Sequence, residues 1–324
     1  MQMARKRLQL LLLLKPFDIY PSPISSSSSS SSSAANQVLT YLQNRTSAHK
    51  HAINICQTVL NARTAAGLVH WKADFRGHVS GPIRGVDLVV TIGGDGTLLQ
   101  ASHLMDDDSI PVLGVNSDPT RPHEVEELND EFDATRSTGY LCAATPDTFE
   151  QILDGILENR CRPSELARMA VSINSNMVQT SALNDILLAH PCPAAVSRFS
   201  FRVKRNGEPL TSLVHCRSSG LRVSTAAGST AAMHSAGGSA MPILSKELQY
   251  MVREPISQMP NAHLMHGWVK SSETMNISWF CREGILYIDG SHVVHSVQLG
   301  DTIELSSRAP ALKVYLPPHL AHSA

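Results

Sequence analysis

The stretch "LVVTIGGDGTLLQASHLM", residues 88–105, runs from an apolar segment through three glycines into a second apolar segment. "VDLVVTI" (86–92) is short and rich in β-branched residues, which predicts a strand buried on both faces. "TLLQASHLM" (97–105) predicts a helix, and "IPVLGVN" (110–116) predicts another buried strand. Strand, glycine turn, helix and strand make a βαβ unit, so this half of the chain should contain an open, mostly parallel sheet.

The glycine turn is suited to phosphate. Gly93, Gly94 and Gly96 let backbone N–H groups approach an anion at the start of a helix. The pattern is neither a Walker A loop nor a GxGxxG fingerprint. Asp95 adds a negative charge that a bare phosphate cradle would not need. It either caps the helix in an Asp-Gly turn or acts as a general base on a hydroxyl that receives phosphate. The buried strand and the double glycine favour the base.

Composition limits the partners. The chain has 324 residues, enough for two ordinary domains, and a formal net charge of −1. Such a balance favours neither nucleic acid nor an anionic membrane as a partner, so an anionic ligand must be held by local geometry. The six cysteines have no CxxC spacing and the histidines form no ligand constellation. We therefore expect reduced thiols and no protein-bound metal.

The N-terminus resembles a signal peptide because basic residues precede the leucine run of residues 8–14. Lys15 and Pro16 end the run early and no small-residue cleavage site follows, so a buried first strand is the better interpretation. The run is also shorter than the roughly 20 residues that a membrane span needs. We expect a cytoplasmic protein, with an organelle (mitochondrion or peroxisome) as the alternative.

Two domains are expected. Residues 1–144 should form the α/β domain, interrupted by a flexible serine-rich insertion at 22–35. Residues 145–305 should be mostly antiparallel β and sandwich-like, opening with one helix capped by Thr145. A C-terminal segment, 306–324, can return to the first domain. Turns are expected at Asn206-Gly207 and Glu283-Gly284.

Two further polar clusters lie in the second half. Asn184 and Asp185, in "SALNDILLA", suit vicinal ribose hydroxyls, although a strand-end turn explains them equally well. The stretch 223–241, "VSTAAGSTAAMHSAGGSAM", offers hydroxyls and backbone amides around a short helix. Taken by itself, such a stretch is more often a flexible connection or a site of close packing. The residues singled out there are Gly228, Ser229, Thr230 and Ser235.

In combination, GGDGT, then Asn-Asp, then Gly-Ser-Thr-Ala followed by Ser-Ala-Gly-Gly resembles the NAD kinase family over roughly residues 80–300. The region "GVNSDPTRPHEVEEL…DATRSTGYLC" is similar to plant NADH kinases and related mitochondrial NAD kinases. The resemblance implies an α/β domain carrying GGDGT, a β-sandwich carrying the other two clusters, and a homodimer.

The resemblance also implies an activity, in which ATP phosphorylates the adenosine-ribose 2′-hydroxyl of NADH, and of NAD⁺ less well. Magnesium would accompany ATP, held mainly through phosphates. Asp95 would be the base, and Asn184 and Asp185 would hold ribose hydroxyls. Gly93, Gly94, Gly96 and Thr97 would lie along phosphates, and Gly228, Ser229, Thr230 and Ser235 would belong to the dinucleotide site.

Three positions depart from the family pattern. Asp185 stands where glutamate is usual, Ala232 where tyrosine is usual, and Ser219 where aspartate is usual. Only the oxidised nicotinamide ring is cationic, so the missing carboxylate at Ser219 raises the hypothesis of an altered preference between NADH and NAD⁺.

Other kinases share GGDGT. The 6-phosphofructokinases do, but no Thr-Ile-Asp-Asn-Asp-like segment is present here. Lipid kinases of the diacylglycerol and sphingosine type also do, but they would leave the Asn-Asp and Gly-Ser-Thr-Ala clusters unexplained. A non-catalytic dinucleotide-binding protein remains an alternative if Asp95 is not a base.

Overall fold

The computed structural model describes residues 7–17, 33–128, 132–256 and 262–321. Contacts divide the chain into two compact units. Unit 1 comprises residues 1–104, 109–164 and 313–321, and unit 2 comprises 105–108, 165–312 and 322–324. Most of the serine-rich insertion lies outside the described residues. Its last three positions, 33–35, belong instead to the first turn of a helix.

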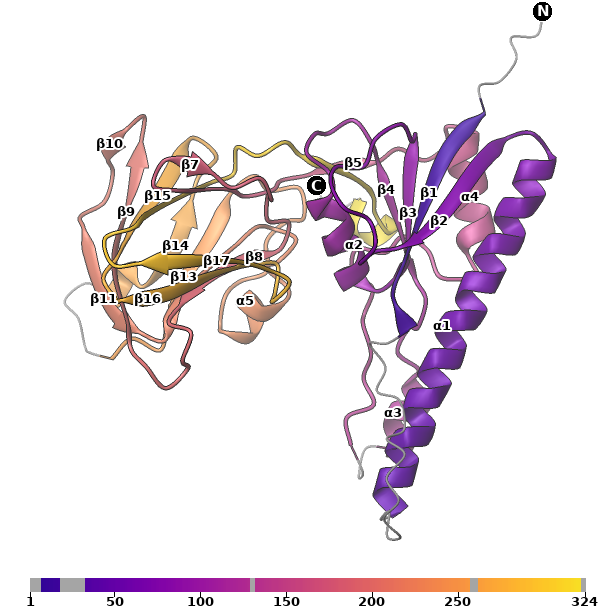
Figure 1. Ribbon diagram of the computed structural model, residues 1–324, viewed down its shortest axis with the longest axis horizontal. Helices are drawn as coiled ribbons and strands as arrows, with labels where there is room; N and C mark the ends of the chain where they lie inside the picture. The colour runs from indigo at the N-terminus through magenta and orange to yellow at the C-terminus, as the bar shows by residue number, and fades with distance from the viewer. Residues whose placement is uncertain (1–6, 18–32, 129–131, 257–261, 322–324) are drawn as a thin grey trace, which may run out of the picture. The chain divides into compact units, whose positions relative to one another are not determined.

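Unit 1 is the expected α/β domain (Figure 1). Its elements are β1 (Leu8–Leu14), α1 (Ser33–Ala65), β2 (Val69–Phe75), β3 (Leu88–Gly93), α2 (Asp95–His103), β4 (Val112–Asn116), α3 (Pro122–Leu128), α4 (Phe149–Leu157), β19 (Leu312–Tyr315) and α6 (Pro318–Ala321), with β5 (Ser164–Leu166) at the boundary.

The sheet of unit 1 has the order β2-β1-β3-β4-β19-β5. Strands β2, β1, β3, β4 and β19 are paired in parallel. The leucine run is the inner strand β1, buried from Leu10 to Leu14, which confirms the sequence-based interpretation. β3 and β4 are buried along their whole length. Strands covered on both faces need continuous apolar runs, so the prediction of a mostly parallel sheet is confirmed.

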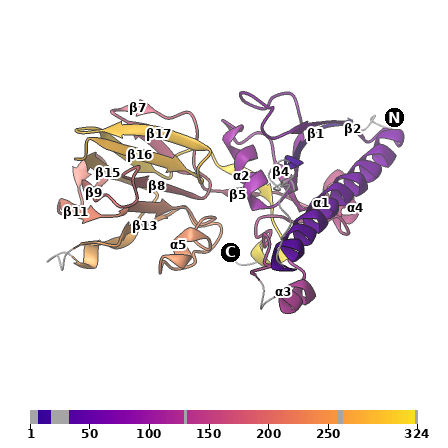
Figure 2. The same ribbon diagram turned by 60° about the horizontal axis from the view of Figure 1, so that its bottom comes forward.

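Helices cover both faces of this sheet. Figures 1 and 2 show α1 and α4 on one side of the strands and α2 on the other. Ile53, Cys56 and Leu60 of α1 join Phe149 and Leu153 of α4 in one core with alternate side chains of the strands. Because α4 packs there, the boundary between the units falls at 164/165 rather than at 144/145.

Unit 2 is an all-β sandwich with one short helix. One sheet has the order β10-β9-β15-β18-β6-β7, with β11 also paired to β9, and the other has the order β14-β13-β12-β8-β16-β17. The bounds are β6 (Ala170–Ile173), β7 (Asn176–Met177), β8 (Asp185–Ala189), β9 (Ser197–Arg205), β10 (Glu208–Pro209), β11 (Val214–Ser218), β12 (Gly220–Ser224), α5 (Ala232–Ser235), β13 (Leu248–Arg253), a 3₁₀ turn (Ala262–Leu264), β14 (His266–Val269), β15 (Glu273–Trp279), β16 (Glu283–Ile288), β17 (Val293–Gln298) and β18 (Thr302–Ser306).

The two sheets of unit 2 enclose a single core. Inward side chains from both sheets alternate with outward polar ones, as in β15, where every second residue is buried. Trp279 and Phe199 stack within this core, with ring centroids 6.2 Å apart. The prediction of a mostly antiparallel second domain is confirmed.

Two local predictions were wrong. The helix after residue 145 begins at Phe149 with Thr148 as its N-cap, because residues 146–148 form a preceding turn. Glu283-Gly284 is not a turn but the start of β16. Gly284 packs under Trp279, where a Cβ would lie 2.5 Å from the indole. The Asn206-Gly207 turn is confirmed, with φ values of 53° and 85°.

In the part of the chain that the structure describes, no helix has the length and apolar character needed to span a membrane.

Candidate active site

Asp95 stands at the junction of strand and helix in unit 1. β3 ends at Gly93, α2 begins at Asp95, and Gly94 is the N-cap residue between them. The expected glycine loop is thus a single residue, and Gly96 and Thr97 already lie in the first helical turn. The N-cap position is thus taken by Gly94, which has no side chain, and no side-chain hydrogen bond caps the helix. Asp95 does not fill the capping role that the sequence analysis considered for it.

The three glycines of this junction differ in the space that surrounds them. A Cβ on Gly93 would lie 2.1 Å from Thr97 Oγ1, and one on Gly94 would lie 2.4 Å from Ser137 Oγ. Both are therefore required by packing within the protein. Gly96 is exposed, with no atom closer than 4.0 Å to its Cβ position. Its backbone is the part of the turn that a ligand can approach.

The carboxylate of Asp95 is held by a distant loop. Its Oδ2 accepts a hydrogen bond from the backbone N–H of Tyr140, and its Oδ1 accepts one from Leu141, each at 2.9 Å. The Cys142 thiol lies 3.8 Å from Oδ1 and donates a weaker bond. Burial raises the pKa of Asp95, and these three donors oppose the rise. The side chain is therefore fixed in orientation and more basic than an exposed aspartate.

A buried ion-pair network supports the segment that reaches Asp95. The Arg136 side chain is 1% exposed and forms ion pairs with Asp118 and Glu124. Arg45 of α1 donates to the same Asp118 at 2.9 Å. The Arg136 guanidinium also lies 5.2 Å from the ring centroid of Tyr41. Removing one partner of such a network is costly, so the network fixes the chain immediately before Tyr140.

Two cationic residues that the sequence analysis missed lie at the same edge of the sheet. Lys15 follows β1 directly and Arg76 follows β2 directly. Arg76 Nη1 donates to Thr97 Oγ1 at 3.2 Å. Parallel strands bring their carboxyl ends together, so the first residue after each predicted strand was the signal available in the sequence.

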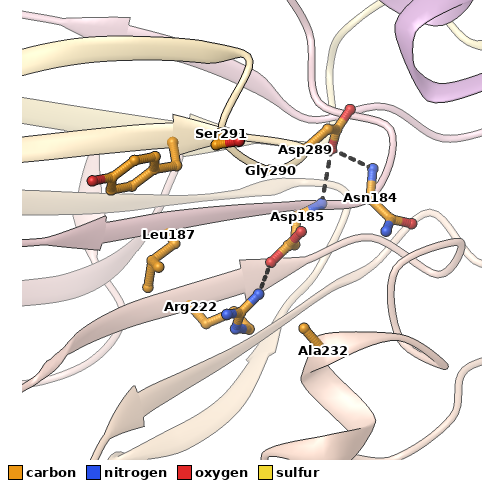
Figure 3. A pocket seen from close by; sticks show the side chains of 9 residues that line it. Asn184, Asp185, Leu187, Arg222, Ala232, Asp289, Gly290 and Ser291 are labelled. Atoms are coloured by element: carbon orange, nitrogen blue, oxygen red, sulfur yellow. Dashed lines mark hydrogen bonds and ion pairs between the residues drawn. The ribbon is translucent and has the colours of Figure 1, made fainter. Parts of the chain in front are cut away.

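In unit 2, Asp289 organises the Asn-Asp cluster. Its carboxylate accepts hydrogen bonds from the backbone N–H groups of Leu183, Asn184 and Asp185 at 2.8, 2.7 and 2.9 Å. Figure 3 shows Asp289 above the two cluster residues, with the Asn184 amide turned away from it. The backbone of both residues is therefore fixed by Asp289, and the Asn184 side chain is left available. The sequence signal for Asp289 was the Asp-Gly turn after β16.

Asp185 is not isolated. It forms an ion pair with Arg222 of β12, and both residues are half-buried (Figure 3). Burial raises the pKa of Asp185, and the charge of Arg222 opposes the rise. The pair lines a pocket of about 420 Å³ together with Asn184, Leu187, Ala232, Tyr287, Asp289, Gly290 and Ser291. Ala232 replaces the larger aromatic of the family pattern in the wall of this pocket.

The Gly-Ser-Thr-Ala cluster divides into packing and surface residues. A Cβ on Gly228 would lie 2.1 Å from the backbone oxygen of Asn184, so the two clusters touch. Ser229 is buried and donates to the Ala226 oxygen at 2.7 Å while accepting from the Met241 N–H at 2.9 Å. Its hydroxyl is structural. Thr230 is half-buried, and Ser235 is exposed at the end of α5, where it lines a second pocket with Arg222 and Ala232.

The missing carboxylate at position 219 has a substitute. The Ser219 hydroxyl donates a hydrogen bond to the carboxylate of Glu254, 35 residues further along the chain. A negative charge thus stands beside Ser219. The sequence analysis considered position 219 without this neighbour, and the effect of Ser219 on the preference between NADH and NAD⁺ stays a prediction.

Comparisons with known proteins agree with this arrangement. Residues 1–118 match the family model of the ATP-NAD kinase N-terminal domain. The chain is 55% identical over 98% of its length to a probable NADH kinase of Oryza sativa subsp. japonica, of which it covers 98%. It is 56% identical to an NADH kinase of Arabidopsis thaliana, with 95% of each chain covered. The chain belongs to the NAD kinase family.

Solved structures of NAD kinases share the fold. A yeast NADH kinase, whose crystal structure holds NADH, superimposes with a TM-score of 0.66 at 15% identity, covering 96% of this chain and 83% of the yeast one. An NAD kinase from Archaeoglobus fulgidus, in complex with ATP, gives a TM-score of 0.61 at 18% identity, covering 97% and 95%. At these identities the likeness concerns the fold alone.

The predicted site residues of this chain thus fall into two groups. Gly93, Gly94, Asp95, Gly96 and Thr97 are together in unit 1, and the structure brings Asn184, Asp185 and Gly228 together in unit 2. Within the described ranges, no group of three or more His, Cys, Asp and Glu side chains is placed to hold a metal ion.

Proposed function

We propose that this protein transfers the γ-phosphate of ATP to the 2′-hydroxyl of the adenosine ribose of NADH, and of NAD⁺ less well. The observation that carries the proposal is the Asp95 carboxylate, fixed by two backbone amides beside an exposed helix start. Whole-length similarity to plant NADH kinases favours this reaction over a lipid kinase.

Asp95 acts as the general base in this proposal. Its carboxylate accepts the proton of the 2′-hydroxyl as the ribose oxygen bonds to the γ-phosphorus, and the bond from that phosphorus to the β,γ-bridging oxygen breaks to release ADP. A carboxylate offers about four lone-pair sites, so the amides of Tyr140 and Leu141 leave room for the substrate proton.

Magnesium would enter with ATP, bound mainly through phosphate oxygens, as it commonly is in kinases. It would neutralise charge that develops on the transferred phosphate. The exposed backbone of Gly96, at the start of α2, would approach the phosphates, since the N-terminal amides of a helix favour anions.

Unit 2 recognises the dinucleotide in this proposal. Asn184 and Asp185, held from behind by Asp289, supply an amide and a carboxylate for ribose hydroxyls. Thr230 and Ser235 contribute hydroxyls, whereas Gly228 and Ser229 shape the site without contacting the ligand through their side chains.

The proposal is tested by incubating the purified chain with ATP, magnesium and either NADH or NAD⁺, and by measuring NADPH and NADP⁺. We expect conversion of both, with a larger kcat/KM for NADH. Parallel reactions with diacylglycerol and sphingosine should give no lipid phosphate. Absence of dinucleotide phosphorylation would refute the proposal.

The preference for NADH is proposed to depend on charge near Ser219. Since Glu254 already places a carboxylate there, Ser219→Asp would add a second one. We expect Ser219→Asp to raise kcat/KM for NAD⁺ relative to NADH, because only the oxidised ring is cationic. An unchanged ratio would show that this position does not sense the nicotinamide.

Homodimerisation and a cytoplasmic location, with a mitochondrion or peroxisome as the alternative, are proposed from the family resemblance and the sequence. Sedimentation of the purified protein and imaging of a C-terminally tagged chain test them.

A further inference from the structure

Two cationic residues lie beside the proposed catalytic aspartate without a role in the mechanism above. Lys15 directly follows β1 and Arg76 directly follows β2, and β1 is paired with both β2 and β3. Because these strands are parallel, both residues stand at the edge of the sheet where Asp95 begins α2. We propose that Arg76 and Lys15 bind the phosphate groups of ATP and position them for transfer, an inference that rests on the proposed function.

Arg76 is placed over the first turn of α2. Its Nη1 donates to Thr97 Oγ1 at 3.2 Å and lies 4.0 Å from the Cβ position of Gly96. The N-terminal end of a helix carries a partial positive charge, so a cation there carries an electrostatic penalty. A phosphate group removes this penalty because it accepts hydrogen bonds from the guanidinium and from the helix amides together.

Lys15 flanks the start of the same turn. Its backbone N–H donates to the Ile92 oxygen at 3.0 Å, and its side-chain Cβ lies 3.2 Å from the Cβ position of Gly93. Burial, with repulsion from Arg45 and Arg76, lowers the pKa of Lys15 to about 8, although Asp118 opposes the shift. The ammonium group is thus held in surroundings that favour an added anion.

The groups that set the charge around Lys15 come from three segments. Arg45 and His49 come from α1, Arg76 from the end of β2, and Asp118 from the segment after β4. Asp118 is already paired with Arg45 at 2.9 Å. Burial lowers the pKa of His49, whose ring nitrogens lie 2.7 Å from Ser117 Oγ and 3.0 Å from the Lys15 oxygen, and so favours the uncharged ring. A polyphosphate at this edge of the sheet would add negative charge beside Arg76 and Lys15.

The two residues differ in what they offer. A guanidinium presents a planar fork that can hold two phosphate oxygens, and an ammonium group acts as a compact point charge. Arg76 should therefore contribute orientation and Lys15 mainly attraction. Neither residue needs to reach the dinucleotide for this role.

The test is the affinity for ATP in the absence of dinucleotide, measured by titration calorimetry with the full chain. A hydrogen bond to a charged group contributes about 1.5–3 kcal/mol, so Arg76→Met and Lys15→Met should each weaken ATP binding roughly tenfold or more. The affinity for NADH should change by less than about twofold, since neither side chain is assigned to it. Exposed residues supply the matched controls Arg160→Met and Lys72→Met, which should bind ATP like the parent.

Conservative variants separate binding from folding. Arg76→Lys and Lys15→Arg keep the charge and should retain most of the affinity. The affinity of the parent for ATP should fall as the pH rises above about 8, where Lys15 loses its proton, and Lys15→Arg should remove that fall. ATP affinity within about twofold of the parent in both folded methionine variants would overturn the inference.

The inference and the proposed function fail in different ways. If the parent binds ATP through Arg76 and Lys15 but does not phosphorylate NADH, the proposed reaction is wrong and the phosphate site stands. If NADH is phosphorylated while the methionine variants bind ATP normally, the reaction stands and the assignment of these two residues is wrong.

Discussion

The backbone N–H of Leu141 donates a hydrogen bond to the carboxylate of Asp95 at 2.9 Å, across 46 residues of sequence. This contact, with the matching one from Tyr140, distinguishes a positioned base from an aspartate in a surface turn. It also predicts how the enzyme responds when either partner is changed.

Asp95→Asn should abolish turnover while leaving dinucleotide binding intact. The amide keeps the size of the side chain but cannot accept the proton of the 2′-hydroxyl, and loss of a general base costs about 10²- to 10⁴-fold in rate. The measurement is kcat with NADH, together with the Kd for NADH. Asp147→Asn, at an exposed position of unit 1, is the matched control. Full activity in Asp95→Asn would show that Asp95 is not the base.

The acidic limb of the pH–rate profile should depend on Cys142. Burial raises the pKa of Asp95, and the base works only when deprotonated, so kcat should fall as the pH drops through that raised pKa. The thiol of Cys142 donates to the carboxylate and opposes the rise. Cys142→Ala removes the donor and should move the limb to higher pH, whereas Cys142→Ser supplies a stronger donor and should move it to lower pH. Identical limbs in the three proteins would show that the thiol does not act on Asp95.

Asp289→Ala should weaken dinucleotide binding without affecting Asp95. Three backbone N–H groups, of Leu183, Asn184 and Asp185, would lose their acceptor, and an unsatisfied buried donor costs about 1–3 kcal/mol. We expect a lower Tm and a KM for NADH raised at least tenfold, with KM for ATP little changed. Asp289→Asn keeps one oxygen acceptor, so its Tm and its KM for NADH should lie between those of the parent and those of Asp289→Ala. Equal effects on both KM values would contradict a role confined to the Asn-Asp cluster.

Gly228→Ala should be among the most disruptive single-methyl changes in unit 2. The new Cβ would stand 2.1 Å from the backbone oxygen of Asn184, and backbone atoms cannot yield as a flexible side chain can. Overpacking of this kind costs about 1–3 kcal/mol or more, so both Tm and NADH affinity should fall. Gly77→Ala, where no atom lies within 4 Å of the Cβ position, is the control and should be neutral. A normal Tm in Gly228→Ala would mean that the two clusters are not in contact.

Local sequence patterns predicted much of the fold. The leucine run and the β-branched run of residues 86–92 predicted β1 and β3 because a strand covered on both faces needs uninterrupted apolar side chains. Patterns failed where a residue's role was set by a neighbour distant in sequence. Gly284 had the composition of a turn, but it lies in β16, paired with Val297 of β17, and its lack of a side chain makes room for the Trp279 ring.

The candidate site was likewise predicted only in part from the sequence. Motif order alone singled out Asp95, Asn184 and Asp185, since the combination of clusters is specific where each one is not. Motif order did not indicate Asp289, Arg222 or Glu254. Each contacts a predicted residue that is distant in sequence, and only the folded chain brings the two together.

For this chain, the sequence by itself determined the βαβ unit and the family, and it singled out Asp95 as the candidate base. These depend on residue types at short spacing, which the chain carries whether folded or not. Only the tertiary structure decided what holds that side chain: backbone amides 45 and 46 residues away and a thiol beside them. The pairing of parallel strands also brought Lys15 and Arg76 to the edge of the sheet where α2 begins, which no local pattern records.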